Sequence, residues 1–266
     1  MAIVERSDSP GLVTMLGRQV DKWWTTYRRT WKGSAVSSFL EPWLYIAAMG
    51  VLLGGYIKGG VGGASSYFEF VAPGLLAANA MMVGVQEAMW PVMGAIKWDK
   101  SYYAMLASPL RIKDIVFGHL GYVAFRLVLS AAIFTAVLSA VGIFHSVPGA
   151  LAALGSAVLT GLAIVTPVYG FSCGAKSEQS FALIFRLGVM PMFLFSGAFF
   201  PISNLSPTLA WIARLTPLWH GVDLTRMLVL GRVDGSLAAI HVAYLLGLTL
   251  IGWVLATRVL EKRLID

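Results

Sequence analysis

Six long apolar stretches follow one another along this chain, and they constrain its fold more than any other feature. They run over about 39–57, 70–94, 115–144, 148–171, 181–200 and 237–257. A helix needs roughly 20 apolar residues to cross a bilayer, so each stretch is long enough to span. Charged residues make up only 12% of the chain, too few to cover a soluble domain. We therefore predict an all-α integral membrane protein with six transmembrane helices in a single domain, 1–266.

The segment before the first stretch, 11–32, has the pattern of an amphipathic helix. Its apolar residues, Trp and Tyr among them, recur at steps of three or four, and Lys and Arg fill positions between them. A basic face opposite a Trp-rich face is typical of a helix that lies in the membrane interface. A soluble amphipathic helix packed on another element is the alternative.

The segment before the last stretch, 201–235, is moderately apolar but interrupted by three prolines and three glycines. It holds two short helical patterns, at about 207–215 and 218–230, and each is too short to cross a bilayer. We predict a re-entrant or interfacial helical hairpin on one side of the membrane. A structured surface loop is the alternative.

The distribution of Lys and Arg predicts the orientation. With the N-terminus inside, fourteen of the 20 basic residues fall on inner segments and four on outer segments. Cytoplasmic segments carry such an excess, so both termini are expected in the cytoplasm and the 201–235 hairpin on the outer side. The net charge of +7 then reflects cytoplasmic loops rather than a nucleic-acid surface.

Among the ionisable residues within the predicted spans, Glu87, Arg126 and Arg186 are the candidates for a role in transport. Charges at this depth often mark an ion-driven mechanism. Glu87 and Arg126 lie at compatible depths, so they could form an ion pair. The pair would be structural, and Arg186 would extend to the inner interface, if the protein is not ion-driven.

Residues with catalytic potential are few and scattered. The four histidines show no metal-binding spacing, and Gly170–Ser177 departs from the spacing of a phosphate-binding loop. The one polar cluster is His220, Asp223 and Arg226, whose spacing of three and six places them on one helical face. They could form part of a gate, or, as the alternative, the site of a lipid-modifying membrane enzyme.

The longest inner loop between spans, 97–113, combines aromatic, apolar and basic residues. Tyr102, Tyr103, Met105 and Leu106 suit a short amphipathic helix that ends near Pro109. Exposed aromatics beside charges are typical of a protein-docking surface. A basic loop held against anionic lipid headgroups is the alternative.

Three sequence motifs resemble a known family. They are Tyr102–Arg111 (YYAMLASPLR), Phe195–Pro201 (FSGAFFP) and Leu215–Gly231 (LTPLWHGVDLTRMLVLG), followed by the basic end of the last span, Arg258–Leu264. Together they resemble the permease subunits of ABC-2 type exporters, which have the type V transporter fold. The chain is most similar to the NodJ-like lipo-oligosaccharide permeases and the daunorubicin-type drug-export permeases.

The resemblance implies a division of labour among subunits in a bacterial plasma membrane. Two permeases, as a homodimer or heterodimer, would form the pathway, and two cytoplasmic ATPase subunits would bind ATP and Mg²⁺. This chain would then be a non-catalytic permease without a cofactor or metal of its own. Its cargo would be an amphipathic, lipid-linked or glycan-bearing compound or, alternatively, a drug or antibiotic. No nucleic acid partner is expected.

The resemblance also implies roles for particular segments. Loop 97–113 would hold the coupling helix that docks on the ATPase, and helix 11–32 would be a connecting helix that also touches it. Hairpin 201–235 would form the outer gate, with His220, Asp223 and Arg226. The coupling residues would be Tyr102, Tyr103, Met105, Leu106, Pro109 and Arg111.

Overall fold

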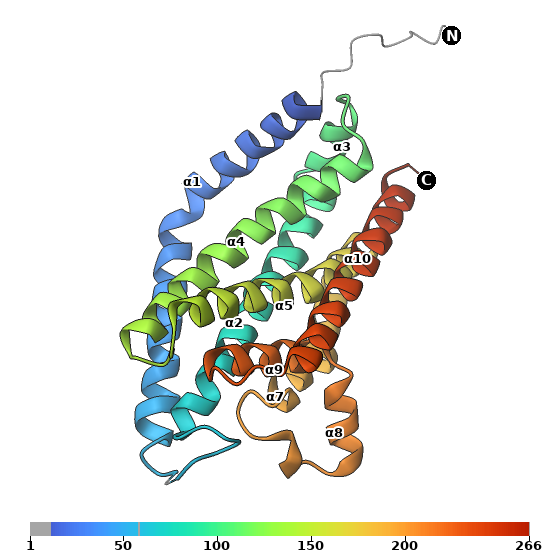
Figure 1. Cartoon of the computed structure of the whole chain (residues 1–266). Helices are drawn as coiled ribbons and strands as arrows, with labels where there is room; N and C mark the ends of the chain where they lie inside the picture. Colours follow the sequence, from blue (N-terminus) through green and yellow to red (C-terminus); the bar gives the residue numbers. More distant parts are fainter. Residues whose placement is uncertain (1–11, 58, 266) are drawn as a thin grey trace, which may run out of the picture.

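The computed structural model describes residues 12–57 and 59–265, and these residues form helices joined by short turns (Figure 1). Gly11, at the start of the predicted interfacial helix, lies outside the described residues. No strand occurs in the described part of the chain, apart from one isolated bridge between Val61 and Ala64. The helices, in chain order, are α1 (Leu12–Tyr45), η1 (Ile46–Leu53), α2 (Tyr67–Met93), η2 (Gly94–Trp98), α3 (Ser101–Leu106), α4 (Ile112–Ala140), α5 (Val147–Gly174), α6 (Gln179–Ile184), η3 (Phe185–Val189), α7 (Met190–Phe195), η4 (Ile202–Asn204), α8 (Pro207–Arg214), α9 (Pro217–Val229) and α10 (Gly235–Ile265).

Four helices in the described residues are long and apolar enough to cross a membrane. They are Tyr67–Trp98, Ile112–Ala140, Val147–Gly174 and Gly235–Ile265. These correspond to the predicted spans at 70–94, 115–144, 148–171 and 237–257. The predicted spans at 39–57 and 181–200 are not among the four. The second of these falls on a shorter apolar helical run, Gln179–Phe195.

The N-terminal segment differs from the prediction in one respect. The predicted interfacial helix and the predicted first span are not separate elements, because α1 passes through both and continues into η1. The segment between them, 33–38, contains no proline, the residue that most strongly ends a helix. Figure 1 shows that α1 changes direction along its length, so its first part runs obliquely to its second part.

Side-chain caps fix where helices α9 and α10 begin. The Thr216 hydroxyl accepts from the Trp219 N–H at 3.3 Å, and Pro217 occupies the first turn of α9. Asp234 caps α10 by accepting from the Ser236 hydroxyl and from the N–H groups of Ser236 and Leu237. Those hydrogen bonds, the Ser236 hydroxyl first, lower the pKa of the Asp234 carboxyl. The turns between α8, α9 and α10 are therefore defined by the sequence itself.

Helix α5 lies at the centre of the bundle and packs against α2, α4, α9 and α10. Small residues allow the close approach: a Cβ on Gly252 of α10 would lie 2.7 Å from the Pro167 nitrogen, and one on Gly170 would lie 3.2 Å from Ala256. Close backbone packing of this kind is common between membrane helices, where apolar burial gives little driving force.

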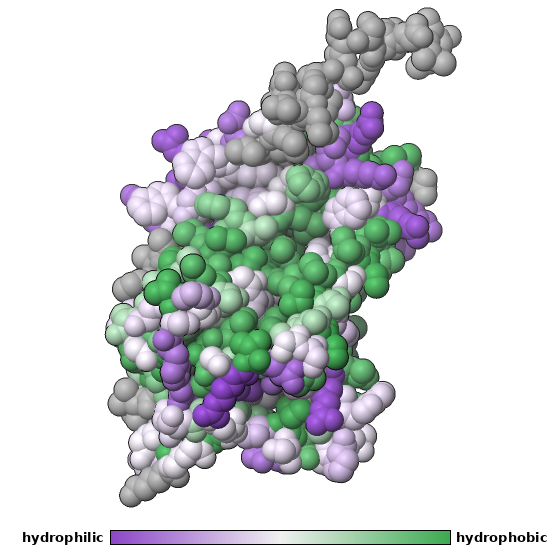
Figure 2. Space-filling model, in the orientation of Figure 1, coloured by the Kyte–Doolittle hydropathy of each residue, from purple (hydrophilic) through white to green (hydrophobic). Residues whose placement is uncertain are grey.

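The two ends of the bundle carry different elements. Figure 1 shows the start of α1, helix α3 and the end of α10 at one end, and helices α7, α8 and α9 toward the other. Figure 2 shows a broad hydrophobic band across the middle of one face, with hydrophilic side chains gathered at the α3 end and a smaller hydrophilic group nearer the α8 end. This distribution is that of a membrane-spanning bundle.

Candidate coupling and gating sites

Helix α3 forms within loop 97–113, where the sequence predicted a short amphipathic helix. Lys100 precedes it in the left-handed conformation, with φ of 49°, and so turns the chain out of η2. Of the two tyrosines, Tyr103 is 42% exposed and Tyr102 is fully buried. Only Tyr103 can therefore contact a partner directly; Tyr102 faces into the bundle.

Tyr102 joins three helices through a chain of hydrogen bonds. His119 Nε2 lies 3.3 Å from the Glu87 carbonyl oxygen, which can only accept, so Nε2 donates and His119 Nδ1 accepts from the Tyr102 hydroxyl. The Tyr102 oxygen in turn accepts from the Tyr169 hydroxyl at 2.8 Å. Burial raises the pKa of the Tyr102 phenol well above its usual value, so the group stays a neutral donor. The chain of bonds ties α3 to α4, α2 and α5.

The other predicted coupling residues lie around Tyr103. Met105, Leu106 and Pro109 are half-buried, and Arg111 is exposed. The Arg111 N–H donates to the Asp114 carboxylate at 2.9 Å, which caps α4. The loop therefore presents Tyr103 and Arg111 outward on a rigid base.

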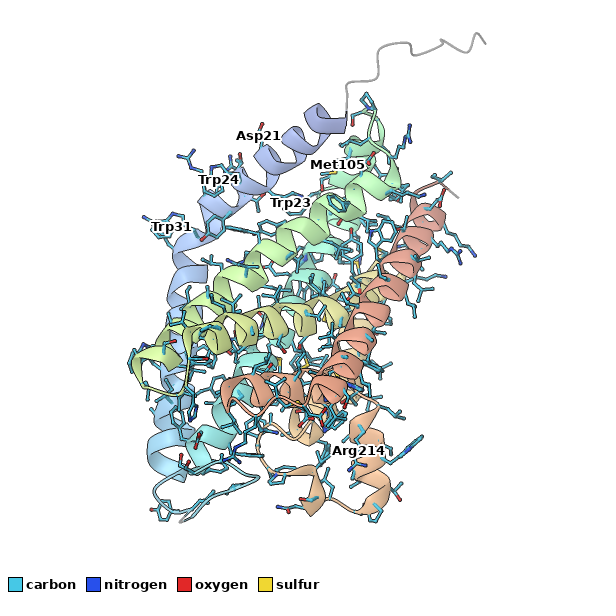
Figure 3. The ribbon with its side chains drawn as sticks, in the orientation of Figure 1. Asp21, Trp23, Trp24, Trp31, Met105 and Arg214 are labelled. Atoms are coloured by element: carbon cyan, nitrogen blue, oxygen red, sulfur yellow. The ribbon has the colours of Figure 1, made fainter. Side chains whose placement is uncertain are left out.

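Helix α1 reaches the same region through Trp23. Its ring stacks on Tyr122 of α4, with ring centroids 4.6 Å apart, and lies 4.6 Å from the His119 ring. Figure 3 shows Trp23 pointing toward α4, whereas Trp24 and Trp31 point away from the bundle. The tryptophans predicted to share one face of this helix therefore point in different directions: Trp23 packs on the bundle, and Trp24 and Trp31 lie on its outside.

The ion pair suggested by the sequence is present. Arg126 Nε lies 2.9 Å from Glu87 Oε1, and the two side chains are 11% and 18% exposed. Arg186, the third charge predicted to lie within a span, lies in η3 and is exposed in the single chain. The pair joins α4 to α2 close to the Tyr102 chain, since the carbonyl of Glu87 is the acceptor for His119.

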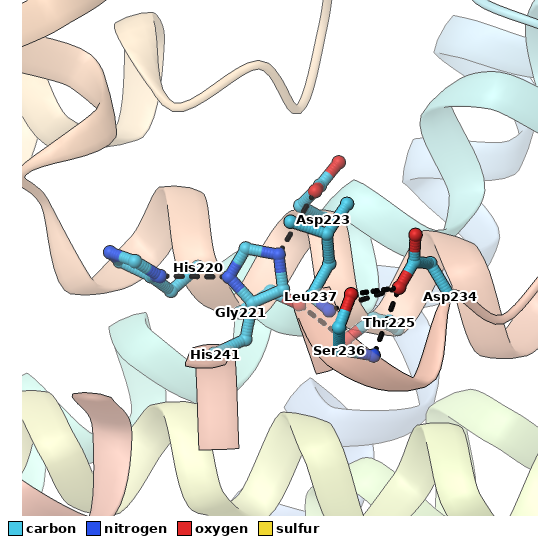
Figure 4. A network of polar contacts seen from close by, with 8 residues as sticks. All are labelled: His220, Gly221, Asp223, Thr225, Asp234, Ser236, Leu237 and His241. Atoms are coloured by element: carbon cyan, nitrogen blue, oxygen red, sulfur yellow. Dashed lines mark hydrogen bonds and ion pairs between the residues drawn. The ribbon is translucent and has the colours of Figure 1, made fainter. Parts of the chain in front are cut away.

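The segment predicted to form the outer hairpin contains α8 and α9, each within one residue of the predicted bounds. His220 and Asp223 both contact His241 of α10: His220 Nδ1 lies 2.8 Å from His241 Nδ1, and His241 Nε2 donates to Asp223 Oδ2 at 3.1 Å (Figure 4). Both imidazoles are buried, and the Tyr244 ring stacks on His220 with centroids 3.9 Å apart. These contacts hold the hairpin on α10.

Arg226, the third member of the predicted cluster, points elsewhere. Its NH2 group donates to the Gly197 carbonyl at 2.7 Å and its Nε to the Phe70 carbonyl at 3.3 Å. The guanidinium also lies 4.0 Å from the centre of the Phe70 ring. Arg226 thus joins α9 to α2 and to the FSGAFFP turn, whereas His220 and Asp223 join α9 to α10.

A second contact joins the hairpin to α5. The hydroxyls of Ser156 and Thr225 lie 2.9 Å apart and both are buried. One turn away, Gly221 packs so closely on Thr160 that a Cβ at Gly221 would lie 2.1 Å from the Thr160 Oγ1. Only glycine fits at this position.

An apolar cavity of about 660 Å³ lies between the hairpin and the spans. Its walls come from α5, α6, η3, α7, α8, α9 and α10, and Phe195, Ile212 and Leu248 are among them. Two hydroxyls line it, and both are engaged: Thr216 donates to the Ala213 carbonyl and Tyr244 to the Leu215 carbonyl. The cavity therefore offers an almost purely apolar surface.

Within residues 12–57 and 59–265, no group of three or more His, Cys, Asp or Glu side chains could hold a metal ion. The histidines instead belong to hydrogen-bonded contacts between helices, as His119, His220 and His241 show. The chemistry of these sites is that of positioning helices against one another.

The described residues thus form an all-helical bundle with four helices long and apolar enough to cross a membrane. Residues 16–230 match the family described as ABC-2 type transporter, so the chain belongs to that family.

Several similar proteins carry the name nodulation protein J. One from Rhizobium leguminosarum biovar trifolii is 32% identical over 250 residues, which cover 91% of this chain and 94% of that protein. One from Bradyrhizobium diazoefficiens is 28% identical over 262 residues, which cover 96% of this chain and 98% of that protein. The similarity therefore extends over nearly the whole of both chains.

Proposed function

We propose that the chain is the permease subunit of an ATP-driven exporter and that it moves an amphipathic, lipid-linked or glycan-bearing compound outward across a bacterial plasma membrane. ABC-2 membership implies a cytoplasmic ABC ATPase as its partner. Two permease copies and two ATPase subunits would make up the complex, and both termini would face the cytoplasm. ATP and Mg²⁺ would bind the ATPase.

The observation that carries this proposal is the geometry of α3. An exposed tyrosine on a short helix is a suitable docking anchor, because a large aromatic side chain loses little freedom on binding. Tyr102, one residue before it, is held inside the bundle by bonds from α4 and α5. A force applied to α3 by a partner would therefore pass to the spans rather than deform the loop.

The cavity supports the proposed class of cargo. A site with no free polar group favours the hydrocarbon portion of a ligand, since any polar atom placed there would lose its hydrogen bonds to water. Its volume of about 660 Å³ lies within the range of ligand sites, roughly 300–1,000 Å³. A cargo with an apolar chain and a polar head would place the chain in this cavity and the head outside it.

Docking at α3 can be tested by recovery of the ATPase subunit with the purified permease. Tyr103→Ala combined with Leu106→Ala removes about 2 kcal/mol of docking energy, which lowers affinity roughly 30-fold. Tyr56→Ala is the matched control, because Tyr56 is 85% exposed but lies in the loop between η1 and α2. Equal recovery of the ATPase with the double variant and with the control would remove α3 from docking.

Transport itself can be measured in proteoliposomes that contain the permease and the ATPase. We expect ATP-dependent movement of a fluorescent glycolipid, and slower movement when Ile212→Trp fills the cavity. Movement of an uncharged aromatic drug probe, with none of the glycolipid, would favour a drug exporter.

A further inference from the structure

The docking helix and the outer hairpin lie at opposite ends of the bundle, and one helix bonds to both. We propose that α5 transmits movement of α3 to the outer hairpin, with Tyr169 and Ser156 as the positioning residues at its two ends. This inference rests on the proposed function, since it supplies the route from the ATPase to the gate.

The inner end of α5 is bonded to the docking helix. The Tyr169 hydroxyl donates to the Tyr102 oxygen at 2.8 Å, and both side chains are fully buried. Because both side chains are fully buried, a shift of α3 alone would break this hydrogen bond with no solvent contact to replace it, which is costly. Tyr169 is therefore expected to follow Tyr102 when α3 moves.

The outer end of α5 is bonded to the hairpin in two places. The Ser156 and Thr225 hydroxyls form a buried hydrogen bond, and Gly221 packs directly on Thr160. The Thr160 hydroxyl is itself fixed, because it donates to the Ser156 carbonyl at 2.7 Å. A displacement of this part of α5 would therefore displace α9.

The two ends belong to one helix that is supported between them. Ser156 and Tyr169 are about 20 Å apart along the axis at roughly 1.5 Å per residue. Pro167 interrupts the backbone hydrogen bonds within this stretch, but Gly252 of α10 packs directly on Thr166 and Pro167. Helix α10 therefore supports α5 at its weakest point, and the two would move together.

The hairpin is joined to α10 as well. His241 of α10 contacts His220 and Asp223 of α9. A shift of α5 with α10 would then carry α9 through contacts on both helices, whereas α2 holds α9 through Arg226. The hairpin is thus bonded to α5 and α10 and also to α2, so a shift of α5 and α10 relative to α2 would change its position, as a gate requires.

The test is the rate at which a polar maleimide labels Thr208→Cys, an exposed position on α8. In the permease–ATPase complex, nucleotide binding should change this rate several-fold. Tyr169→Phe and Ser156→Ala should each reduce the change to less than a third while the ATPase is still recovered in full. The native thiol Cys173 is buried, and the chain without Thr208→Cys gives the background.

Tyr67→Phe is the matched control. It removes the hydroxyl of another buried tyrosine, whose bond goes to the Phe199 carbonyl at 3.1 Å and not to α5. It should leave the nucleotide response intact. A full response in both Tyr169→Phe and Ser156→Ala would overturn the proposal.

A second measurement needs no partner. In the purified permease alone, Tyr102→Phe should change the labelling rate at Thr208→Cys at least twofold, because the change at α3 reaches the hairpin through α5. An unchanged rate would overturn the link even if the ATPase docks as proposed. Failure of the ATPase to bind the permease would contradict the proposed function and leave this measurement to decide the link.

Discussion

Gly221→Ala should disrupt the contact between the hairpin and α5. The new Cβ would lie 2.1 Å from Oγ1, 2.3 Å from Cγ2 and 2.8 Å from Cβ of Thr160. Rotation about χ1 of Thr160 cannot relieve all three overlaps, because the Thr160 Cβ is fixed by the backbone. Thr160 is fully buried, so the two helices must separate.

The expected cost lies at the upper end of the range for overpacking, about 3 kcal/mol. Against this, Ala is favoured over Gly within a helix by about 1 kcal/mol. The net loss of about 2 kcal/mol should lower the midpoint of thermal unfolding, followed by tryptophan fluorescence of the permease in detergent. The Thr160→Gly change removes all three overlapping atoms, so the double variant should recover part of the loss.

Gly247→Ala is the control. Gly247 lies within α10, and a Cβ there would meet no atom within 4 Å. Its substitution should be neutral or stabilising, since only helix propensity changes. If Gly221→Ala proved as stable as Gly247→Ala, or if Thr160→Gly failed to restore stability, the close packing of α9 on α5 would be refuted.

Two further predictions concern the interior of the bundle. Glu87→Gln or Arg126→Gln should each reduce the yield of folded protein in a size-exclusion assay, because the remaining charge is left in a low dielectric. The exchange Glu87→Arg with Arg126→Glu should restore part of that yield, and no recovery would show that the pair does not matter. Cys173, at the inner end of α5, is fully buried and should resist maleimide from either side of the membrane, whereas Lys176→Cys, which is exposed, should react only in inside-out vesicles; labelling of Lys176→Cys in intact cells would reverse the proposed orientation.

The local elements were predictable from the sequence because their signals are local. Four of the predicted spans coincide with long apolar helices, since length and hydropathy suffice to define them. Helices α8 and α9 begin at prolines that follow a capping Ser or Thr, so their bounds could be placed to within a residue. The continuity of α1 was missed because Gly33 and the serines at 34, 37 and 38 are typical of a break between helices, yet α1 passes through them.

The partners of the candidate residues were less predictable. The spacing of His220, Asp223 and Arg226 predicted a shared helical face, but not that His241 would face two of them and α2 the third. Tyr102 was expected at the docking surface, because an aromatic residue in a polar loop gives no sign of burial. These contacts join residues far apart in the chain, and only the packing of helices decides them.

His119 and Tyr169 were missed for the same reason. Each is one polar side chain within a long apolar stretch, and such residues are also common in helices without a functional role. A buried polar residue in a membrane span does require a hydrogen-bond partner, and that requirement could have marked both as members of a network. The sequence does not say which members meet.

The most direct test of the account is a cross-link between α3 and the ATPase subunit. Ala104 lies next to Tyr103 and is exposed, so Ala104→Cys should cross-link to a cysteine in the docking groove of the ATPase, with a yield that changes when nucleotide binds. The permease purified alone should hydrolyse no ATP. Two results would contradict the account. One is ATP hydrolysis by the permease alone. The other is a complex that still exports cargo but gives no cross-link at Ala104→Cys, either with or without nucleotide.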